Sequence, residues 1–155
     1  MIFLSKLIAT GFGVGYFPKA PGTVGSLLAV FLYYIFFPNE PSVLIHAVFF
    51  IILALFFGLG VWTATRVETI YGHDPSCVVI DEIVGMGLTL FLVPKSWIWI
   101  LTGLVLFRLM DITKWLGADR MQQLKGGWGV MMDDVVAGFW SCITLHLLIR
   151  IINFI

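Results

Sequence analysis

Five long apolar stretches, separated by shorter polar segments, dominate the sequence. They cover residues 27–37, 43–65, 83–93, 97–107 and 135–149. A helix needs about 20 consecutive apolar residues to span a bilayer, and only the second stretch reaches that length unaided. The fifth stretch reaches it if its helix continues past Arg150 to Phe154, and the first becomes longer if its helix begins near Thr23.

The stretches are continuously apolar and lack the alternation of barrel strands, so they are expected to be helices. The third and fourth are separated only by Pro94, Lys95 and Ser96. They form either two short spans or a re-entrant hairpin. The pattern therefore predicts one all-α domain over residues 1–155, an integral membrane helical bundle with about four to five transmembrane or re-entrant helices.

The composition agrees with a membrane protein. Hydrophobic residues make up 60% of the chain, charged residues 12%, and the mean hydropathy is +1.03. Soluble domains contain about 45–50% apolar and about 25% charged residues. The formal net charge is zero, and no basic patch or tail suggests nucleic-acid binding. Cys77 and Cys142 are not spaced like metal ligands or a disulfide framework, so they are interpreted as reduced packing residues.

The charged residues gather on one side of the predicted bundle. If successive stretches cross the membrane alternately, segments 1–26, 66–82 and 108–134 share a side. They contain most of the basic residues: Lys6, Lys19, Arg66, Arg108, Lys114, Arg120 and Lys125. Only Lys95 and Arg150 lie opposite, so the positive-inside rule predicts that the charged side is cytoplasmic. All the acidic residues except Glu40 lie on that side too.

Acidic residues stand directly at the ends of three apolar stretches. Asp81 and Glu82 precede the third, Asp111 follows the fourth, and Asp133 and Asp134 stand at the entrance to the fifth. If the helix ends converge, these carboxylates form a site for a hard cation such as Mg²⁺, which prefers oxygen ligands. Helix capping is the alternative, and it explains one acid per helix start better than two adjacent ones.

The segment PKAPGTVGS at 18–26 has the composition of an anion-binding turn. Gly22 and Gly25 allow a ligand to approach the backbone, Thr23 and Ser26 offer hydroxyl groups, and Lys19 adds a positive charge. A helix that begins here would point free N–H groups at an anion. The segment is not a Walker A loop, because no Gly-Lys-Ser/Thr follows. The alternative is an ordinary Pro/Gly turn with a Thr or Ser N-cap.

Arg108, Asp111 and Lys114 are spaced three apart and share one helical face. The two basic side chains suit phosphate binding, or they form an ion-pair ladder with Asp111. His73 and Asp74 are weaker candidates for an acid/base pair, since a loop histidine is more often only solvated. Acidic metal ligands beside basic anion binders favour phosphoryl chemistry on a membrane-bound substrate.

Five motifs in this order resemble the phosphatidylglycerophosphatase A family. They are PKAPGTVGS, HD at 73–74, IDEIVGM at 80–86, FRLMD at 107–111 and GGWGVMMDDVVAG at 126–138. The resemblance implies a Mg²⁺-dependent lipid phosphatase, multi-pass in the bacterial inner membrane, with its active site on the cytoplasmic side. It would hydrolyse phosphatidylglycerophosphate in the bilayer to phosphatidylglycerol and inorganic phosphate.

The resemblance carries over to particular residues. The expected catalytic residues and metal ligands are Asp81, Glu82, Asp111, Asp133 and Asp134. The expected phosphate-binding residues are Lys19, Gly22, Thr23, Gly25, Ser26, Arg108 and Lys114. The third motif usually continues as Lys-Pro in this family, but here Lys114 is followed by Trp115, Leu116 and Gly117, so the chain departs from the family pattern after Lys114.

Several alternatives stay open at the level of sequence. The attacking group is either a water or one of the carboxylates, which would form an aspartyl phosphate. A divalent-cation or anion transporter is the rival function, because acids beside membrane stretches also mark ion paths. A protein that only binds lipid would not need five clustered carboxylates. Nothing in the sequence indicates an oligomeric state or an acyl-chain preference.

Overall fold

Helices form the whole of the regular structure in this computed structural model, which describes residues 2–114 and 117–154. In chain order they are α1 (Ile2–Ala9), the 3₁₀ turn η1 (Val14–Tyr16), α2 (Pro21–Phe36), α3 (Val43–Tyr71), α4 (Ile80–Thr89), α5 (Trp97–Thr113), α6 (Ala118–Met121) and α7 (Gly127–Phe154). The described residues contain no strand, so the prediction of an all-α fold is confirmed. Trp115 and Leu116, where the family pattern breaks, lie outside the described residues.

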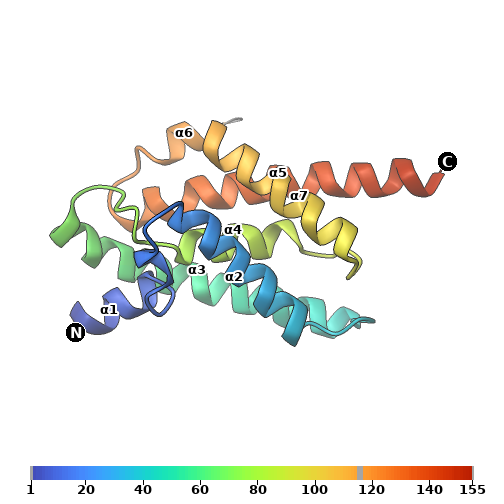
Figure 1. Cartoon of the computed structure of the whole chain (residues 1–155), viewed down its shortest axis with the longest axis horizontal. Coiled ribbons are helices and arrows are strands. Elements are labelled where there is room, and N and C mark those ends of the chain that lie inside the picture. The colour runs from blue at the N-terminus through green and yellow to red at the C-terminus, as the bar shows by residue number, and fades with distance from the viewer. Residues whose placement is uncertain (1, 115–116, 155) are drawn as a thin grey trace.

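The short helix α4 lies at the centre of the bundle and packs against α2, α3, α5 and α7 (Figure 1). Its contact with α7 is close because glycines face each other. A Cβ on Gly138 would lie 2.3 Å from the carbonyl oxygen of Gly85, and a Cβ on Gly85 would lie 2.7 Å from that of Asp134. Small residues allow two helix backbones to approach this closely. The contact brings the acidic start of α4 beside the acidic segment of α7.

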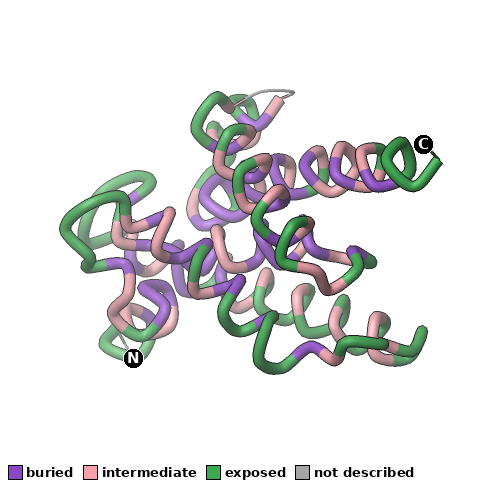
Figure 2. Tube along the Cα trace, turned by 45° about the vertical axis from the view of Figure 1, so that its right-hand side comes forward, coloured by how far each residue is buried: buried purple, intermediate pink, exposed green. Residues whose placement is uncertain are grey.

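Two helices are long and apolar enough to cross a membrane by length and composition: α3 with 29 residues and α7 with 28. They correspond to the second and fifth apolar stretches. Many large apolar side chains on α3 are exposed, including Leu44, Ile51 and Leu55, as expected for a surface that faces lipid. In Figure 2 the buried residues concentrate toward the middle of the molecule, and exposed ones follow its outer helices and ends.

The other apolar helices are shorter. α4 has ten residues, about 15 Å of helix, which is half of a hydrocarbon core about 30 Å thick. That length favours the re-entrant alternative for the third stretch. α2 has 16 residues and α5 has 17, so the structure leaves the count of four to five membrane helices as a prediction.

The start of α7 differs from the sequence prediction. The helix begins at Gly127, eight residues before the apolar stretch that predicted it. Asp133 and Asp134 therefore lie inside the second turn of α7 and not at its entrance. The glycines of the first turn pack tightly, since a Cβ on Gly127 would lie 2.2 Å from the carbonyl oxygen of Val61. Close packing on α3, which the hydropathy pattern does not reveal, explains why a helix forms here.

Candidate active site

Five acidic side chains from three helices line one cavity, with a volume of about 280 Å³. α4 supplies Asp81 and Glu82, α5 supplies Asp111, and α7 supplies Asp133 and Asp134. We call this space the acidic cavity. It thus unites all the carboxylates that the sequence pattern singled out, while their parts in catalysis stay predictions.

The first turn of α4 fixes the positions of Asp81 and Glu82. Just before the helix, the backbone N–H of Val79 donates to the carbonyl oxygen of Ala9 (2.9 Å), which ties the start of α4 to the end of α1. The backbone N–H of Glu82 donates to Oδ1 of Asp81 (3.0 Å). N–H groups in a first turn have no partner within the helix, so this place favours negative side chains.

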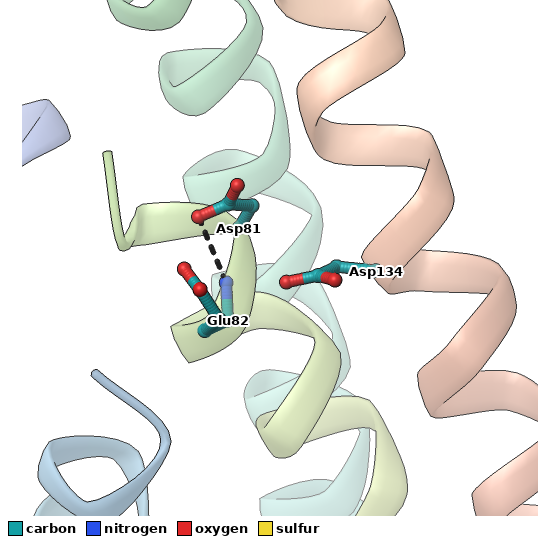
Figure 3. A group of neighbouring side chains, drawn as sticks. All are labelled: Asp81, Glu82 and Asp134. Atoms are coloured by element: carbon teal, nitrogen blue, oxygen red, sulfur yellow. Dashed lines mark hydrogen bonds between the residues drawn. The ribbon is translucent and has the colours of Figure 1, made fainter. Parts of the chain in front are cut away.

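The two aspartates of α7 face different neighbours, because consecutive residues of a helix are turned by about 100°. Asp134 points toward Asp81 and Glu82 (Figure 3). Asp133 instead contacts Nζ of Lys114 through Oδ2 (2.6 Å). Helix capping explains neither residue, since both lie well inside the helix.

Asp81, Glu82 and Asp134 form a carboxylate cluster. Each offers one oxygen within 4.8 Å of those of the other two. Asp81 and Asp134 are buried, and Glu82 is nearly so. Oε2 of Glu82 and Oδ2 of Asp134 are buried with no hydrogen-bond partner among the described residues. Burying carboxylate oxygens without a partner costs free energy. Three carboxylate oxygens this close together are suitable ligands for a divalent cation.

The pKa shifts of the two carboxyl groups on α4 also favour a cation in this cluster. Burial raises the pKa of the Asp81 carboxyl. Burial raises the pKa of Glu82 even further, and the neighbouring charges of Asp81, Asp134 and Asp111 add to the effect. Without a counter-charge, this cluster therefore resists full ionisation. A cation held between the oxygens would offset both shifts, because its charge favours the ionised carboxylates.

Basic side chains hold the other two carboxylates. Asp111 lies 2.8 Å from Nη1 of Arg108 and 3.1 Å from Nζ of Lys114. Nη1 of Arg108 also lies 3.8 Å from Oε1 of Glu82. Arg108 therefore contacts both Asp111 and the carboxylate cluster. Burial opposes the charge of Lys114, but Asp133 and Asp111 outweigh it and keep the pKa of its ammonium group above the usual value. Lys114 is thus a fixed positive charge in this site.

Of the predicted anion-binding turn at 18–26, only the middle part, residues 20–22, lines the acidic cavity. Gly22 borders the cavity at the first turn of α2. A Cβ there would lie 2.0 Å from Oε1 of Glu82 and 3.1 Å from Nη1 of Arg108, so only glycine fits without displacing them. Ala20 and Pro21 border it as well. Pro21 has no N–H group, so the first backbone N–H of α2 is that of Gly22, a residue at this border, and a helix N-terminus favours an anion.

The rest of that turn has packing roles. Ser26 donates its hydroxyl to the carbonyl oxygen of Gly22 (2.9 Å). Gly25 packs on α4, since a Cβ there would lie 2.8 Å from Cβ of Val79. Lys19 is exposed and Thr23 is half-buried, and neither lines the acidic cavity.

The histidine and aspartate of the HD motif separate. His73 is mostly exposed and contacts Glu68 through Nδ1 (2.9 Å), away from the acidic cavity. Asp74 borders the cavity. Its backbone N–H donates to Glu68 (3.2 Å), and its carboxylate accepts a hydrogen bond from Gln122. Asp74 thus stays a candidate by position, and His73 does not.

Sequence reasoning missed some of the lining. Ser76, Pro75 and Val78 border the acidic cavity beside Asp74. The sequence contains one indication that Ser76 belongs to the site, because it lies between the HD and IDEIVGM motifs in one polar segment. A lone serine there resembles any loop residue, so the pattern did not mark it.

A comparison with known families identifies the chain. A family model described as Phosphatidylglycerophosphatase A matches residues 7–149. The chain belongs to the phosphatidylglycerophosphatase A family. Every residue that lines the acidic cavity falls inside the matched range. The protein is therefore a phosphatase enzyme whose family-defining segment carries the site.

Curated relatives agree on the family and differ in their names. Phosphatidylglycerophosphatase A of Escherichia coli is 35% identical over 145 residues, covering 90% of this chain and 80% of that protein. The Haemophilus influenzae protein of the same name is 38% identical over 142 residues, covering 90% and 85%. A Bacteroides thetaiotaomicron protein provisionally named a phosphatidylinositol-3-phosphatase is 43% identical over 146 residues, covering 92% of both. No solved structure is a significant match.

Proposed function

We propose that this enzyme is a Mg²⁺-dependent phosphatase that hydrolyses phosphatidylglycerophosphate to phosphatidylglycerol and inorganic phosphate. The observation that carries the proposal is the carboxylate cluster, with its partnerless buried oxygens, next to Arg108 and the start of α2. It combines oxygen ligands for a cation with positive groups for a phosphate in one cavity. The family and the two relatives that share its name support the substrate.

Asp81, Glu82 and Asp134 would hold the magnesium, and Asp111 and Asp133 stand next to them as further oxygen donors. When bound, Mg²⁺ would neutralise charge on the phosphate and lower the pKa of a water. The residues of the chain orient the substrate. Arg108 faces the cavity as a guanidinium that suits a phosphate, and Gly22 lets the Glu82 carboxylate and Arg108 come close to the α2 N-terminus.

Lys114 contributes charge and not a proton. Its ammonium group already lies between Asp111 and Asp133, and its raised pKa makes proton loss unfavourable. The leaving glycerol oxygen therefore needs a proton from elsewhere, and Asp74 is a carboxyl at the cavity edge. The attacking group is either a water or a cavity carboxylate. A phosphorylated enzyme carboxylate, trapped with acid during turnover and released by hydroxylamine, would indicate the second route.

We further propose that the acidic cavity lies at the cytoplasmic face of the bacterial inner membrane. The polar segments that supply the cavity carry most of the basic residues, which the positive-inside rule assigns to the cytoplasm. α3 and α7 have the length and composition of membrane spans. The lipid headgroup would then meet the cavity at the depth of the bilayer interface.

A phosphatidylinositol 3-phosphate phosphatase is the second candidate, because of the name of the Bacteroides relative. Both lipids present a phosphate monoester on a polyol headgroup, so the same cluster and arginine would serve either one. They differ in the bulk of the alcohol, a glycerol or an inositol ring. The transporter alternative is less well supported, since the described charged groups of the cavity gather at one end of the bundle.

The deciding experiment measures phosphate release by the purified enzyme in mixed micelles. We expect release from phosphatidylglycerophosphate with Mg²⁺, little release after chelation with EDTA, and recovery when Mg²⁺ is restored. Phosphatidylinositol 3-phosphate is the competing substrate. A higher kcat/KM for that lipid would select the second candidate, and folded enzyme without activity on either lipid would refute both.

A further inference from the structure

A second cavity lies between α2 and α3 and is almost entirely apolar. It is a groove of about 330 Å³. Both helices pack on α4. Their backbones lie apart from each other, and the rings of Tyr33 and Phe49 meet between them, so α4 forms the floor of the groove. The lining residues include Ala29, Tyr33, Ile52, Phe56, Ile83 and Gly87, and none of the lining side chains is charged. We call it the apolar groove.

The apolar groove begins where the acidic cavity ends. On α4, Glu82 borders the acidic cavity, and the next residue, Ile83, lines the apolar groove. On α2, Gly22 borders the cavity and Ala29 lines the groove, seven residues or about 10 Å further along the helix. A molecule with a charged end in the cavity and an apolar tail would thus have both parts accommodated along the same two helices.

The dimensions of the apolar groove suit one hydrocarbon chain of a single leaflet. Its lining on α3 extends from Ile45 to Phe56, about 17 Å of helix. One leaflet contributes about 15 Å to the hydrocarbon core. At the far end the rings of Phe37 and Phe49 meet (5.1 Å between centroids), and Nζ of Lys95 donates to the carbonyl oxygen of Phe37 (2.5 Å). These contacts hold that end of α2 in place.

Tyr33 lines the apolar groove, but its hydroxyl group has a hydrogen-bond partner outside the lining. The hydroxyl of Tyr33 donates to the carbonyl oxygen of Val93 (3.2 Å), a residue that does not line the apolar groove. The ring of Tyr33 therefore presents carbon to the groove, while its oxygen is satisfied on the side of α5. A polar ligand would find no partner here, whereas an acyl chain needs none.

We propose that the apolar groove binds one acyl chain of the lipid whose phosphate occupies the acidic cavity. This inference rests on the proposed function, because it takes the headgroup in the cavity to be that of a phospholipid. The glycerol and second phosphate of phosphatidylglycerophosphate separate its terminal phosphate from the acylated glycerol, which accounts for the spacing between cavity and groove. The groove makes the enzyme sensitive to chain length.

The test narrows the apolar groove without touching the acidic cavity. Val48 and Ile52 line the groove and are partly exposed, whereas Leu55, one turn further along the same helix, is exposed and does not line it. Val48→Trp and Ile52→Trp are the test variants, and Leu55→Trp is the matched control. Each is assayed on phosphatidylglycerophosphate with palmitoyl chains and with hexanoyl chains, in mixed micelles with Mg²⁺.

We expect the groove variants to lower kcat/KM for the palmitoyl lipid by about tenfold and to leave the hexanoyl lipid unchanged. Leu55→Trp should change neither. Equal losses on both lipids, or no loss in either groove variant, would overturn the inference. No phosphate release by the unaltered enzyme from either lipid would instead refute the proposed function.

Photo-crosslinking gives a readout that does not depend on turnover. The probe is phosphatidylglycerophosphate with a diazirine at the end of one acyl chain. We expect label on the groove side of α2 and α3, and less label after Val48→Trp. Label spread evenly over the exposed face around Leu55 would mean bulk lipid contact only. No label in the groove, together with a change in oligomeric mass after Val48→Trp, would mean that a second copy of the chain covers it. Either result overturns the proposal.

Discussion

Asp134 is the carboxylate that joins α7 to the cluster on α4, and its removal is the most direct test of the metal site. Asp134→Asn keeps the shape but removes one negative ligand. We expect phosphatase activity to fall by about a thousandfold or more, because charge stabilisation at a metal site supplies several kcal/mol. Phosphate release under saturating Mg²⁺ is the measurement, with Asp119→Asn on the exposed part of α6 as the control.

The same variant has a second signature in stability. Like charges within about 5 Å repel, so Asp134→Asn should unfold at an equal or higher temperature than the unaltered protein when Mg²⁺ is absent. Added Mg²⁺ should then raise the unfolding temperature of the unaltered protein more than that of the variant. An equal Mg²⁺ effect on both proteins would remove Asp134 from the metal site.

Replacing Lys114 tests whether its positive charge contributes to substrate binding and catalysis. Lys114 separates Asp111 from Asp133 as a fixed cation. Lys114→Met should raise KM for the phosphate lipid and lower kcat, each by roughly tenfold, because Asp133 loses its basic partner and Asp111 loses one of its two. Lys114→Arg should recover part of the activity. Full activity in Lys114→Met would show that the charge has no part in substrate binding.

Acidic residues at the ends of the apolar stretches were good predictors of the acidic cavity. Two adjacent acids, twice over, are unusual in an apolar chain, and the structure brings both pairs to one place. The turn at 18–26 was less predictable, since a hydroxyl serves equally well for a ligand or for a backbone carbonyl. Ser26 contacts the carbonyl oxygen of Gly22, a choice that only the packed helix determines.

At the scale of elements, the close contact of α4 with α7 sets the geometry of the cluster. Gly138→Ala would place a Cβ 2.3 Å from a backbone oxygen of Gly85, so the helices must separate. We expect a loss of about 1–3 kcal/mol in unfolding free energy, together with reduced activity as Asp134 moves from α4. Unfolding by denaturant in micelles and phosphate release are the measurements.

Gly58→Ala is the matched control, because a Cβ on Gly58 of α3 meets nothing within 4 Å. Alanine favours a helix interior over glycine by about 0.5–1 kcal/mol. This variant should be as stable as the unaltered protein or slightly more so. If Gly138→Ala behaves like Gly58→Ala, the α4–α7 contact is not the constraint that we infer.

Hydropathy predicted α3 well and the start of α7 poorly, for a physical reason. α3 is apolar along most of its length and ends less than two turns past the apolar stretch at 43–65, so the pattern nearly coincides with the helix. The first two turns of α7 contain glycines and aspartates, which have low helix propensity. Contacts with α3, α4 and α6 stabilise them as helix, and those contacts are not visible in one sequence.

For the whole molecule, the proposed orientation predicts sidedness. Glu40 lies in the connection between α2 and α3, and Arg120 lies on α6 near the polar end of α7. In a background with Cys77 and Cys142 replaced, Arg120→Cys should react with an impermeant thiol reagent only from the cytoplasmic side, and Glu40→Cys only from the opposite side. Labelling of intact cells and inverted vesicles distinguishes them. Reaction of both positions from one side would refute the predicted topology.

The apolar groove has a thermodynamic consequence for how the substrate arrives. Exposing hydrocarbon to water costs about 0.8 kcal/mol for each methylene, so an enzyme that pulled its lipid out of the bilayer would pay that cost over a whole chain. A groove bounded by the outward-facing helices α2 and α3 lets the chain slide sideways from one hydrocarbon environment into another. Only the charged headgroup then has to exchange water for protein, and diffusion within the membrane plane delivers the lipid to the enzyme.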